Sequence, residues 1–321
     1  MSVVATVMRT APIDAEHGTR MALLRDYAML CKVRVLLMVI VVWTGGFYLG
    51  LHRTGSFHLS GSFIVALFGI SAVAAGASAL NQVIERSSDL LMTRTASRPV
   101  AQNRLSPAHG VTVGLILIVG GSLLLTLGSN LLSAGLAVIT AAGYVAAYTP
   151  LKSVSQFNII VGSIFGALPP LIGWTAATGK IEWPGLALFA VLVVWQLPHI
   201  AAIGWLNRED YARAGIRVPA SLCDVQAAAR SSAIWAVAFA ILMIPVSLWA
   251  AQLYRVGALS MIVVLGLGMW YLGLALRFAK ITRNADADLG IGRARDLLRG
   301  SVIYLPMLLL TVLLSAHSAR G

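Results

Sequence analysis

Charged residues are scarce in this chain, and cysteine is almost absent. Only 11% of the 321 residues are Asp, Glu, Lys or Arg, whereas 58% are hydrophobic; a soluble domain has about 25% charged residues. This composition excludes an ordinary soluble protein, a disordered chain and a coiled coil. The two cysteines, Cys31 and Cys223, are far apart and match no CxxC pattern. We therefore expect neither a disulfide framework nor a cysteine-based zinc site.

Acidic residues are rarer than basic residues. The chain has 12 Asp and Glu against 24 Lys and Arg, a formal net charge of +12, and a mean hydropathy of +0.83. A nucleic-acid partner is not expected, because no basic stretch is interleaved with aromatic residues in a soluble module. Membrane proteins collect Lys and Arg in their cytoplasmic loops, so we expect the surroundings to be a lipid bilayer.

Long uncharged runs dominate the rest of the sequence. Each covers roughly 24–32 Å as a helix, close to the thickness of a bilayer core. Backbone polar groups in lipid must be satisfied internally, which favours helices over irregular structure. We predict an all-α polytopic membrane helical bundle of about nine transmembrane helices. The runs are 35–51, 61–80, 110–127, 131–148, 158–176, 184–204, 233–252, 256–276 and 301–316.

The distribution of basic residues predicts the orientation of the bundle. If the N-terminus is inside, 20 of the 24 Lys and Arg fall in inside segments, and only Glu182 of the acidic residues falls outside. This asymmetry places the N-terminus and the long loops in the cytoplasm. We expect a cytosolic tail at 1–30 with a short interfacial helix, one transmembrane domain at 31–316, and a short tail at 317–321. Scattered acids near the start disfavour a targeting presequence and favour a bacterial inner membrane.

The loop after the second run combines acids with bases. Asn81, Glu85 and Asp89 are spaced i, i+4, i+8, so a helix would stack them on one face at the end of a span. Two carboxylates one turn apart repel each other, which predicts a positive charge between them. Mg²⁺ prefers oxygen ligands and substrate phosphates, and the arginines that follow, Arg94 and Arg98, suit phosphate oxygens. The alternative is a solvated polar helix end with arginine partners.

A second polar loop follows the sixth run. It contains Asn207, Arg208 and Asp210, and four spans separate it from the first loop. This spacing predicts two four-helix halves plus one span, with the two loops facing each other. His199, just after Pro198, is the only side chain within the proposed spans that would normally titrate near neutral pH, which makes it a functional candidate. A hydrogen-bonded helix-end histidine is the alternative.

Three segments together resemble the UbiA family of membrane prenyltransferases. The first is NxxxE-R-xx-D with RTxxRP at 81–99, the second is YTPLK at 148–152 with GALPPLIGW at 166–174, and the third is WQLPH at 195–199 with DYARAG at 210–215. The segment Lys32-Val33-Arg34 also resembles the short basic segment that precedes the first span in members of the family. The RTxxRP, GALPPLIGW and WQLPH strings resemble the heme-modifying branch more than the quinone-type branch.

The resemblance implies a reaction and a set of functional residues. The reaction is transfer of a farnesyl group from farnesyl diphosphate to a vinyl group of heme b, giving heme O and diphosphate, with Mg²⁺ as cofactor. The implied catalytic residues are Asn81, Glu85, Asp89, Tyr148 and Asp210. The implied metal ligands are Asn81, Glu85, Asp89, Asn207 and Asp210. The implied substrate-binding residues are Lys32, Arg34, Arg94, Arg98, Lys152, His199 and Arg208.

This chain departs from the family pattern at both loops. Glu85 stands where the family usually has Asp, and Asn207 and Tyr211 stand where quinone-type relatives have aspartates. Expected partners are heme A synthase or cytochrome oxidase assembly proteins. An aromatic, quinone-type prenyltransferase is the enzyme alternative. A secondary transporter is disfavoured, because the spans are uncharged and the acids gather at one edge.

Overall fold

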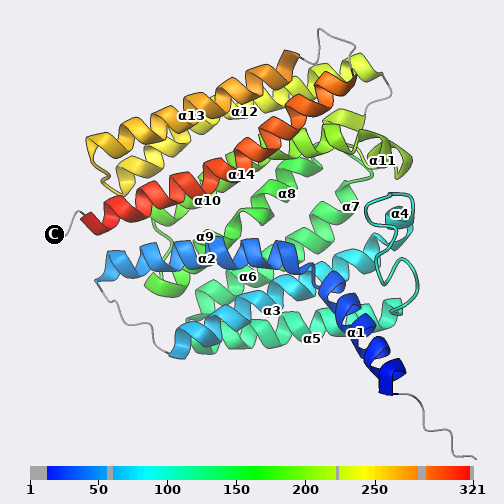
Figure 1. The fold of residues 1–321 in the computed structure, drawn as a ribbon. Helices are drawn as coiled ribbons and strands as arrows, with labels where there is room; N and C mark the ends of the chain where they lie inside the picture. The colour runs from blue at the N-terminus through cyan, green and yellow to red at the C-terminus, as the bar shows by residue number, and fades with distance from the viewer. Residues whose placement is uncertain (1–12, 56–60, 222–223, 281–286, 319–321) are drawn as a thin grey trace, which may run out of the picture.

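The computed structural model describes residues 13–55, 61–221, 224–280 and 287–318, and these residues form a bundle of helices (Figure 1). Within these ranges, nine helical segments are long and apolar enough to cross a membrane. They confirm the prediction of an all-α membrane bundle. The segments are α2 (Val33–Thr54), α3 (Gly61–Ile84), α5 (Pro107–Gly128), the run Leu131–Leu151, the run Asn158–Thr178, α10 (Trp183–Leu206), α12 (Val225–Leu253), α13 (Ala258–Ala279) and Gly290–Ser315 of α14 (Ala287–Ser318).

The helix starts follow from local sequence. Ser106 caps α5 by accepting a hydrogen bond from the His109 amide, and Pro107 occupies the first turn. Asp224 caps α12 through the amides of Gln226 and Ala227. Each cap accepts hydrogen bonds from first-turn amides that have no partner within the helix, and contributes about 1 kcal/mol to stability.

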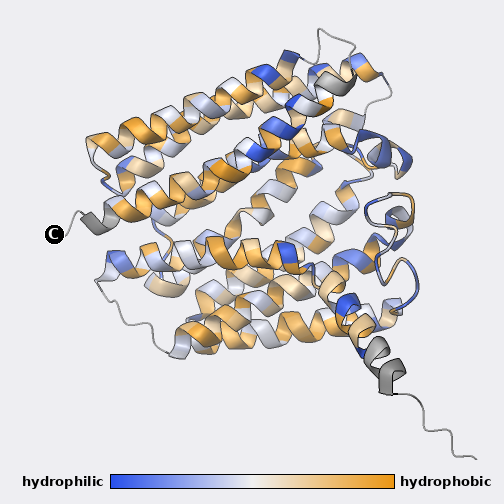
Figure 2. Cartoon of the chain, in the orientation of Figure 1, coloured by the Kyte–Doolittle hydropathy of each residue, from blue (hydrophilic) through white to orange (hydrophobic). Residues whose placement is uncertain are grey.

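The outer surface is apolar along the bundle. Leu127 and Ile116 on α5 are 79% and 66% exposed, and hydrophobic colour covers most of the length of the helices in Figure 2. Hydrophilic residues gather instead near α4 (Arg86–Leu90), α11 (Arg208–Arg213) and the start of α14. This arrangement suits a lipid-facing belt with a polar face at one end.

The buried core divides into two large clusters, as two halves would require. One contains residues of α2, α3, α6 (Leu131–Ala142) and α9 (Leu168–Thr178), and the other is built mainly from α10, α12, α13 and α14. Helices of the first cluster approach closely through small residues: a Cβ added to Gly46 would lie 2.0 Å from the Pro170 oxygen. Such contacts let backbones pack without a hydrophobic driving force between spans.

The fifth span is broken, which the sequence pattern did not predict. It consists of α8 (Asn158–Gly166) and α9, which meet at Ala167. Pro169 and Pro170 cannot donate backbone hydrogen bonds to the preceding turn, so the helix cannot continue unchanged through this point. Ile159 of α8 belongs to the second core cluster, whereas Ile172 of α9 belongs to the first. The boundary between the halves therefore runs through this span.

Both polar loops lie at the same end of the bundle. In Figure 1, α4, α7 (Thr149–Leu151) and α11 lie together on the right, and α1 (Ile13–Leu30) projects from the same end. The predicted helix before the first span is thus present. The parts of the two predicted tails at 1–12 and 319–321 lie outside the described residues.

Candidate active site

The acid face predicted after the second span extends from α3 to α4 across the junction at Glu85. The amide of Glu85 donates to the Asn81 carbonyl at 3.0 Å, and the amide of Asp89 donates to the Glu85 carbonyl at 2.8 Å. The three side chains therefore lie one turn apart. Asn81 and Asp89 are 0% exposed and Glu85 is 8% exposed. A solvated polar helix end would leave them open to water, so the buried arrangement favours the functional interpretation.

Three basic side chains neutralise this face. Arg98 Nη1 donates to both carboxylate oxygens of Asp89 at 2.7 and 2.8 Å and lies 3.7 Å from Glu85 Oε2. Lys152 Nζ donates to Glu85 Oε1 at 2.5 Å. Lys32 Nζ donates to Asn81 Oδ1 at 2.5 Å. The positive charge expected between the two carboxylates is thus supplied by the chain's own Arg98. Hydrogen-bond donors therefore lie next to the oxygen atoms that could bind a metal ion.

Burial and charge shift the protonation equilibria of the face in different directions. Burial opposes ionisation of Glu85, but Lys152 and Lys32 outweigh it and hold the pKa of this carboxyl below its usual value. Burial raises the pKa of Asp89 despite its hydrogen bonds from Arg98. Burial, followed by the charge of Arg98, lowers the pKa of Lys32 to about 7. The protonation state of each of these groups therefore depends on the charges of its neighbours in the cluster.

An aromatic wall lies beside the acid face. Gly143–Tyr148 form a π-helical segment between α6 and α7, a feature that often marks functional sites. The Tyr144 and Tyr148 rings lie 5.3 Å apart, and Lys152 Nζ lies 4.5 Å from the centre of the Tyr148 ring. Thr149 links the wall to the acid face, because its hydroxyl accepts from Asn81 Nδ2 at 3.0 Å. Two electron-rich rings thus face the cationic cluster.

Gly162 on α8 makes room for this wall. A Cβ at Gly162 would lie 2.5 Å from Tyr148 Cε2, which is closer than side chains pack. We predict that Gly162→Ala displaces the Tyr148 ring. For the farnesyl diphosphate that the family resemblance implies as substrate, kcat/KM should fall by about 10-fold, since small misplacements of positioning groups slow reactions strongly. The matched control is Gly120→Ala, where no atom lies within 4 Å of the added methyl; it should retain activity. Equal activity of both variants would contradict the role given to Tyr148.

The second loop docks on the first. Asp210 accepts a hydrogen bond from the Thr93 hydroxyl at 3.2 Å and one from the backbone amide of Arg94, and it is ion-paired with Arg213. Burial of Asp210 is outweighed by these hydrogen bonds, which lower the pKa of its carboxyl. Asp89 and Asp210 therefore belong to the same end of the molecule, which a shared diphosphate site requires.

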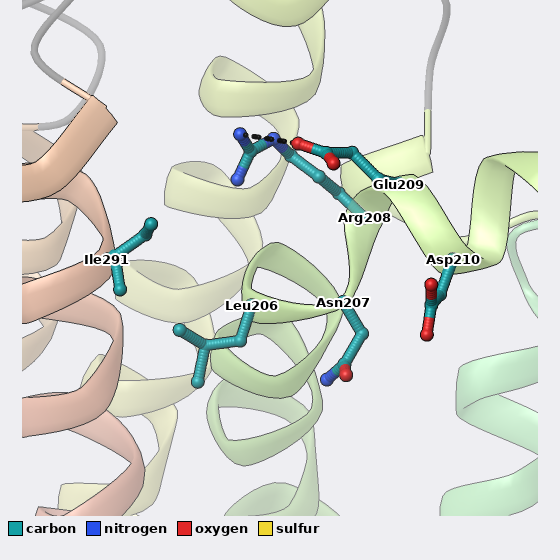
Figure 3. A pocket seen from close by; sticks show the side chains of 6 residues that line it. All are labelled: Leu206, Asn207, Arg208, Glu209, Asp210 and Ile291. Atoms are coloured by element: carbon teal, nitrogen blue, oxygen red, sulfur yellow. Dashed lines mark hydrogen bonds and ion pairs between the residues drawn. The ribbon is translucent and has the colours of Figure 1, made fainter. Parts of the chain in front are cut away.

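Figure 3 shows the pocket beside the second loop. The Asn207 and Asp210 side chains point to the same side, whereas Arg208 and Glu209 point the other way and form an ion pair. Asn207 Nδ2 donates to the Ile203 carbonyl at 2.8 Å, so this bond uses the amide nitrogen and not the side-chain oxygen. The cavity measures about 290 Å³ and is lined by Leu206, Asn207, Arg208, Glu209, Asp210 and Ile291.

Four of the predicted substrate-binding residues make no hydrogen bond or ion pair with Asn81, Glu85 or Asp89. Arg208 packs over the Trp205 ring at 4.9 Å and pairs with Glu209. Arg34 and Arg94 are exposed at the surface. His199 lies within α10 and contacts Ser301 of α14. Of the predicted basic residues, only Lys32, Arg98 and Lys152 contact the acid face directly.

Two contributions to the site were missed from sequence. Tyr144 precedes Tyr148 by four residues and Lys152 by eight, so the spacing rule that selected the acid face would have found it. The link between Asp26 and Arg104 had no comparable signal, because 78 residues separate the two. Arg104 also donates to the Ser97 carbonyl at 2.9 Å. It thereby ties α1 to the segment that carries Arg98.

The chemistry of the donor set fits Mg²⁺. Among the residues that the structure describes, no group of three or more His, Cys, Asp and Glu forms a protein-only metal cage. Mg²⁺ does not need one, since it is commonly bound by one or two carboxylates together with waters and substrate phosphates. Glu85 and Asp89 supply two carboxylates, and Asn81 supplies an amide oxygen. These residues would hold the ion only together with a phosphate-bearing substrate.

Comparison with known proteins identifies close relatives of the whole chain. A protoheme IX farnesyltransferase of Koribacter versatilis is 39% identical over 306 residues, covering 95% of this chain and 97% of that protein. A protoheme IX farnesyltransferase of an Anaeromyxobacter species is 34% identical over 318 residues, covering 99% of this chain and 100% of that protein. The similarity therefore extends over all spans and both polar loops.

Solved structures share the fold at low sequence identity. A digeranylgeranylglyceryl phosphate synthase structure superposes with a TM-score of 0.71 at 16% identity, covering 91% of this chain and 98% of that one. A UbiA homologue of Archaeoglobus fulgidus bound to DMAPP and Mg²⁺ superposes with a TM-score of 0.62 at 13% identity, covering 89% and 99%. The model of the UbiA prenyltransferase family matches residues 37–290. With its nine apolar spans and its paired polar loops, the chain belongs to the UbiA prenyltransferase family.

Proposed function

We propose that this chain transfers a farnesyl group from farnesyl diphosphate to a vinyl group of heme b, producing heme O and diphosphate. The observation that carries the proposal is the buried acid face of Asn81, Glu85 and Asp89, held against three basic side chains at one end of an apolar bundle. The near full-length relatives named protoheme IX farnesyltransferase support heme as the acceptor. Both substrates partition into membranes, which suits a site inside a bundle of spans.

The residues match the needs of the reaction. The allylic carbon–oxygen bond breaks, and its electron pair leaves with the diphosphate, so negative charge builds on the leaving group. Lys152 and Arg98 are placed to donate hydrogen bonds there, and preorganised donors stabilise developing charge strongly. When bound, Mg²⁺ would neutralise further charge on the leaving group. Asn81, Glu85 and Asp89 would hold it.

The carbon that becomes cationic must be protected from water. The rings of Tyr144 and Tyr148 face the cationic end of the site and offer electron-rich surfaces. The π-electron pair of the heme vinyl group then forms the new carbon–carbon bond. Water adds its oxygen to the resulting cation and loses a proton, which completes the hydroxyl-bearing side chain. An apolar surround keeps water away until the first bond has formed.

The cellular setting follows from charge and from the relatives. Twenty of the 24 basic residues lie in alternate segments that include both polar loops, which supports a cytoplasmic N-terminus and a cytoplasmic active site. The two protoheme IX farnesyltransferases are from bacteria, Koribacter versatilis and an Anaeromyxobacter species, which supports a bacterial inner membrane. Heme A synthase and cytochrome oxidase assembly proteins are suitable partners, because the product must pass from one membrane protein to another.

A competition assay tests the proposal. Purified protein in membranes is given farnesyl diphosphate, heme b, an aromatic acid acceptor and Mg²⁺ together. We expect heme O as the product by pigment extraction and chromatography, and removal of Mg²⁺ with EDTA should abolish it, since the leaving group then keeps its full charge. Restoring Mg²⁺ is the control. A prenylated aromatic acid beside unchanged heme b would establish the quinone-type alternative instead.

A further inference from the structure

His199 forms a second polar site, away from the acid face. It lies in the membrane-spanning part of α10, eight residues before Asn207, or about 12 Å along the helix axis at 1.5 Å per residue. The reaction steps above do not use it. Its Nδ1 atom lies 2.6 Å from Ser301 Oγ of α14. An ionisable side chain inside a span is costly to keep, so a function is expected of it.

The hydrogen bonds of Ser301 determine which ring nitrogen carries the proton. Ser301 Oγ donates its single hydrogen to the Leu298 carbonyl at 2.6 Å. A serine hydroxyl has only one hydrogen to give, so with that hydrogen assigned to the Leu298 carbonyl, Ser301 accepts from His199. The proton of the neutral imidazole is therefore on Nδ1, and Nε2 carries a free lone pair.

The ring is also held in a fixed orientation. Its plane stacks on Trp195 with centroids 4.9 Å apart and an interplanar angle of 25°. Trp195 Nε1 in turn donates to the Ser301 carbonyl at 2.8 Å, so one serine anchors both rings. Among the described residues, Nε2 has no hydrogen-bond partner. It is also not one of the described polar atoms that are fully buried without a partner. The direction of the lone pair is thus fixed, and no described side chain donates to it.

An oriented lone pair with the other nitrogen donating is the arrangement that metal-binding histidines use. A free ion would need further protein ligands, and the described residues contain no cluster of three or more His, Cys, Asp and Glu. A heme iron brings its own ring nitrogens and needs a single axial ligand from the protein. We propose that His199 Nε2 ligates the iron of the heme acceptor, with Ser301 as its positioning residue. The inference rests on the proposed function.

Optical and resonance Raman spectra of ferric heme b bound to the purified full-length protein test the ligation directly. The wild-type protein should show histidine ligation, and His199→Ala should lose it and bind heme at least about 10-fold more weakly. Added imidazole should restore the wild-type spectrum. The matched control is His109→Gln, since His109 lies at the surface end of α5 and contacts Tyr27; its spectrum should be unchanged. An unaltered spectrum in His199→Ala would overturn the inference.

Iron-free protoporphyrin separates ligation from packing. If His199 binds iron, His199→Ala should weaken binding of heme b but leave binding of the iron-free ring within about 2-fold. Equal losses for both rings would mean that His199 only packs against the macrocycle. Ser301→Ala frees the ring and should weaken heme binding by about 10-fold, and this variant keeps the test informative if His199→Ala does not fold. Heme O formation by wild-type protein without histidine ligation would overturn this inference alone; absence of heme O would overturn the proposed function.

Discussion

Replacing Asp89 with Asn should reduce the rate of heme O formation by roughly 10²–10³-fold, the loss that follows removal of one preorganised electrostatic group. Asp89 is fully buried, and both of its carboxylate oxygens accept from Arg98 Nη1, at 2.7 and 2.8 Å. The amide keeps the shape of the side chain but removes a carboxylate that would hold Mg²⁺. The measurement is heme O by chromatography at saturating heme b, over a range of Mg²⁺ concentrations.

The control for this variant is Asp224→Asn. Asp224 caps α12 through two amides, and Asn caps helices nearly as well as Asp. This variant should therefore keep wild-type activity. If Asp89→Asn retained more than half of the wild-type rate, the acid face would not be the metal and diphosphate site.

Replacing Lys152 with Gln should lower kcat/KM for farnesyl diphosphate by about 10²-fold. Lys152 is the cation nearest both Glu85, at 2.5 Å, and the Tyr148 ring, at 4.5 Å. Its loss removes a hydrogen-bond donor to the leaving group. Glu85 then keeps its ion pair with Arg98, in which Nη1 lies 3.7 Å from Oε2. Steady-state kinetics at varied farnesyl diphosphate measure the effect. Lys180→Gln, an exposed lysine beyond α9, is the matched control and should behave as wild type.

Loss of stability must be distinguished from loss of catalysis in this variant. Removing one partner of a buried ion pair destabilises a protein by about 3–5 kcal/mol, so Lys152→Gln should also lower the melting temperature. The double variant Lys152→Gln with Glu85→Gln removes both charges and should recover much of that stability. We expect it to fold and remain inactive. Recovery of activity together with stability would show that Lys152 has only a structural role.

The sequence predicted local features of the site well. Asn81, Glu85 and Asp89 share a face because helix geometry alone places residues four apart in register, and the structure shows that face buried. The same reasoning did not anticipate the π-helical segment at Gly143–Tyr148 or the break at Ala167. Hydropathy contains no signal for a local change of helix type, whereas the Pro169-Pro170 pair after Ala167 is a signal for the break that the hydropathy pattern did not use.

The basic residues show the limit of spacing arguments most clearly. Arg98 and Lys152 were expected near the diphosphate, but their individual carboxylate partners were not predictable. Arg208 was expected beside them and instead pairs with Glu209 on the other side of the second loop (Figure 3). A sequence places a charge in a loop, but the direction of the side chain depends on neighbours from other helices.

Composition and spacing were sufficient for the membrane bundle, its nine spans and the two polar loops, because each of these depends on interactions within one segment or between a segment and lipid. The pairing of Lys32 with Asn81, 49 residues apart, and of Thr93 with Asp210, 117 residues apart, required the folded chain. The same is true of the contact between His199 and Ser301, which lie on different helices. Such contacts form only when helices pack side by side, and packing depends on the shapes of many side chains together.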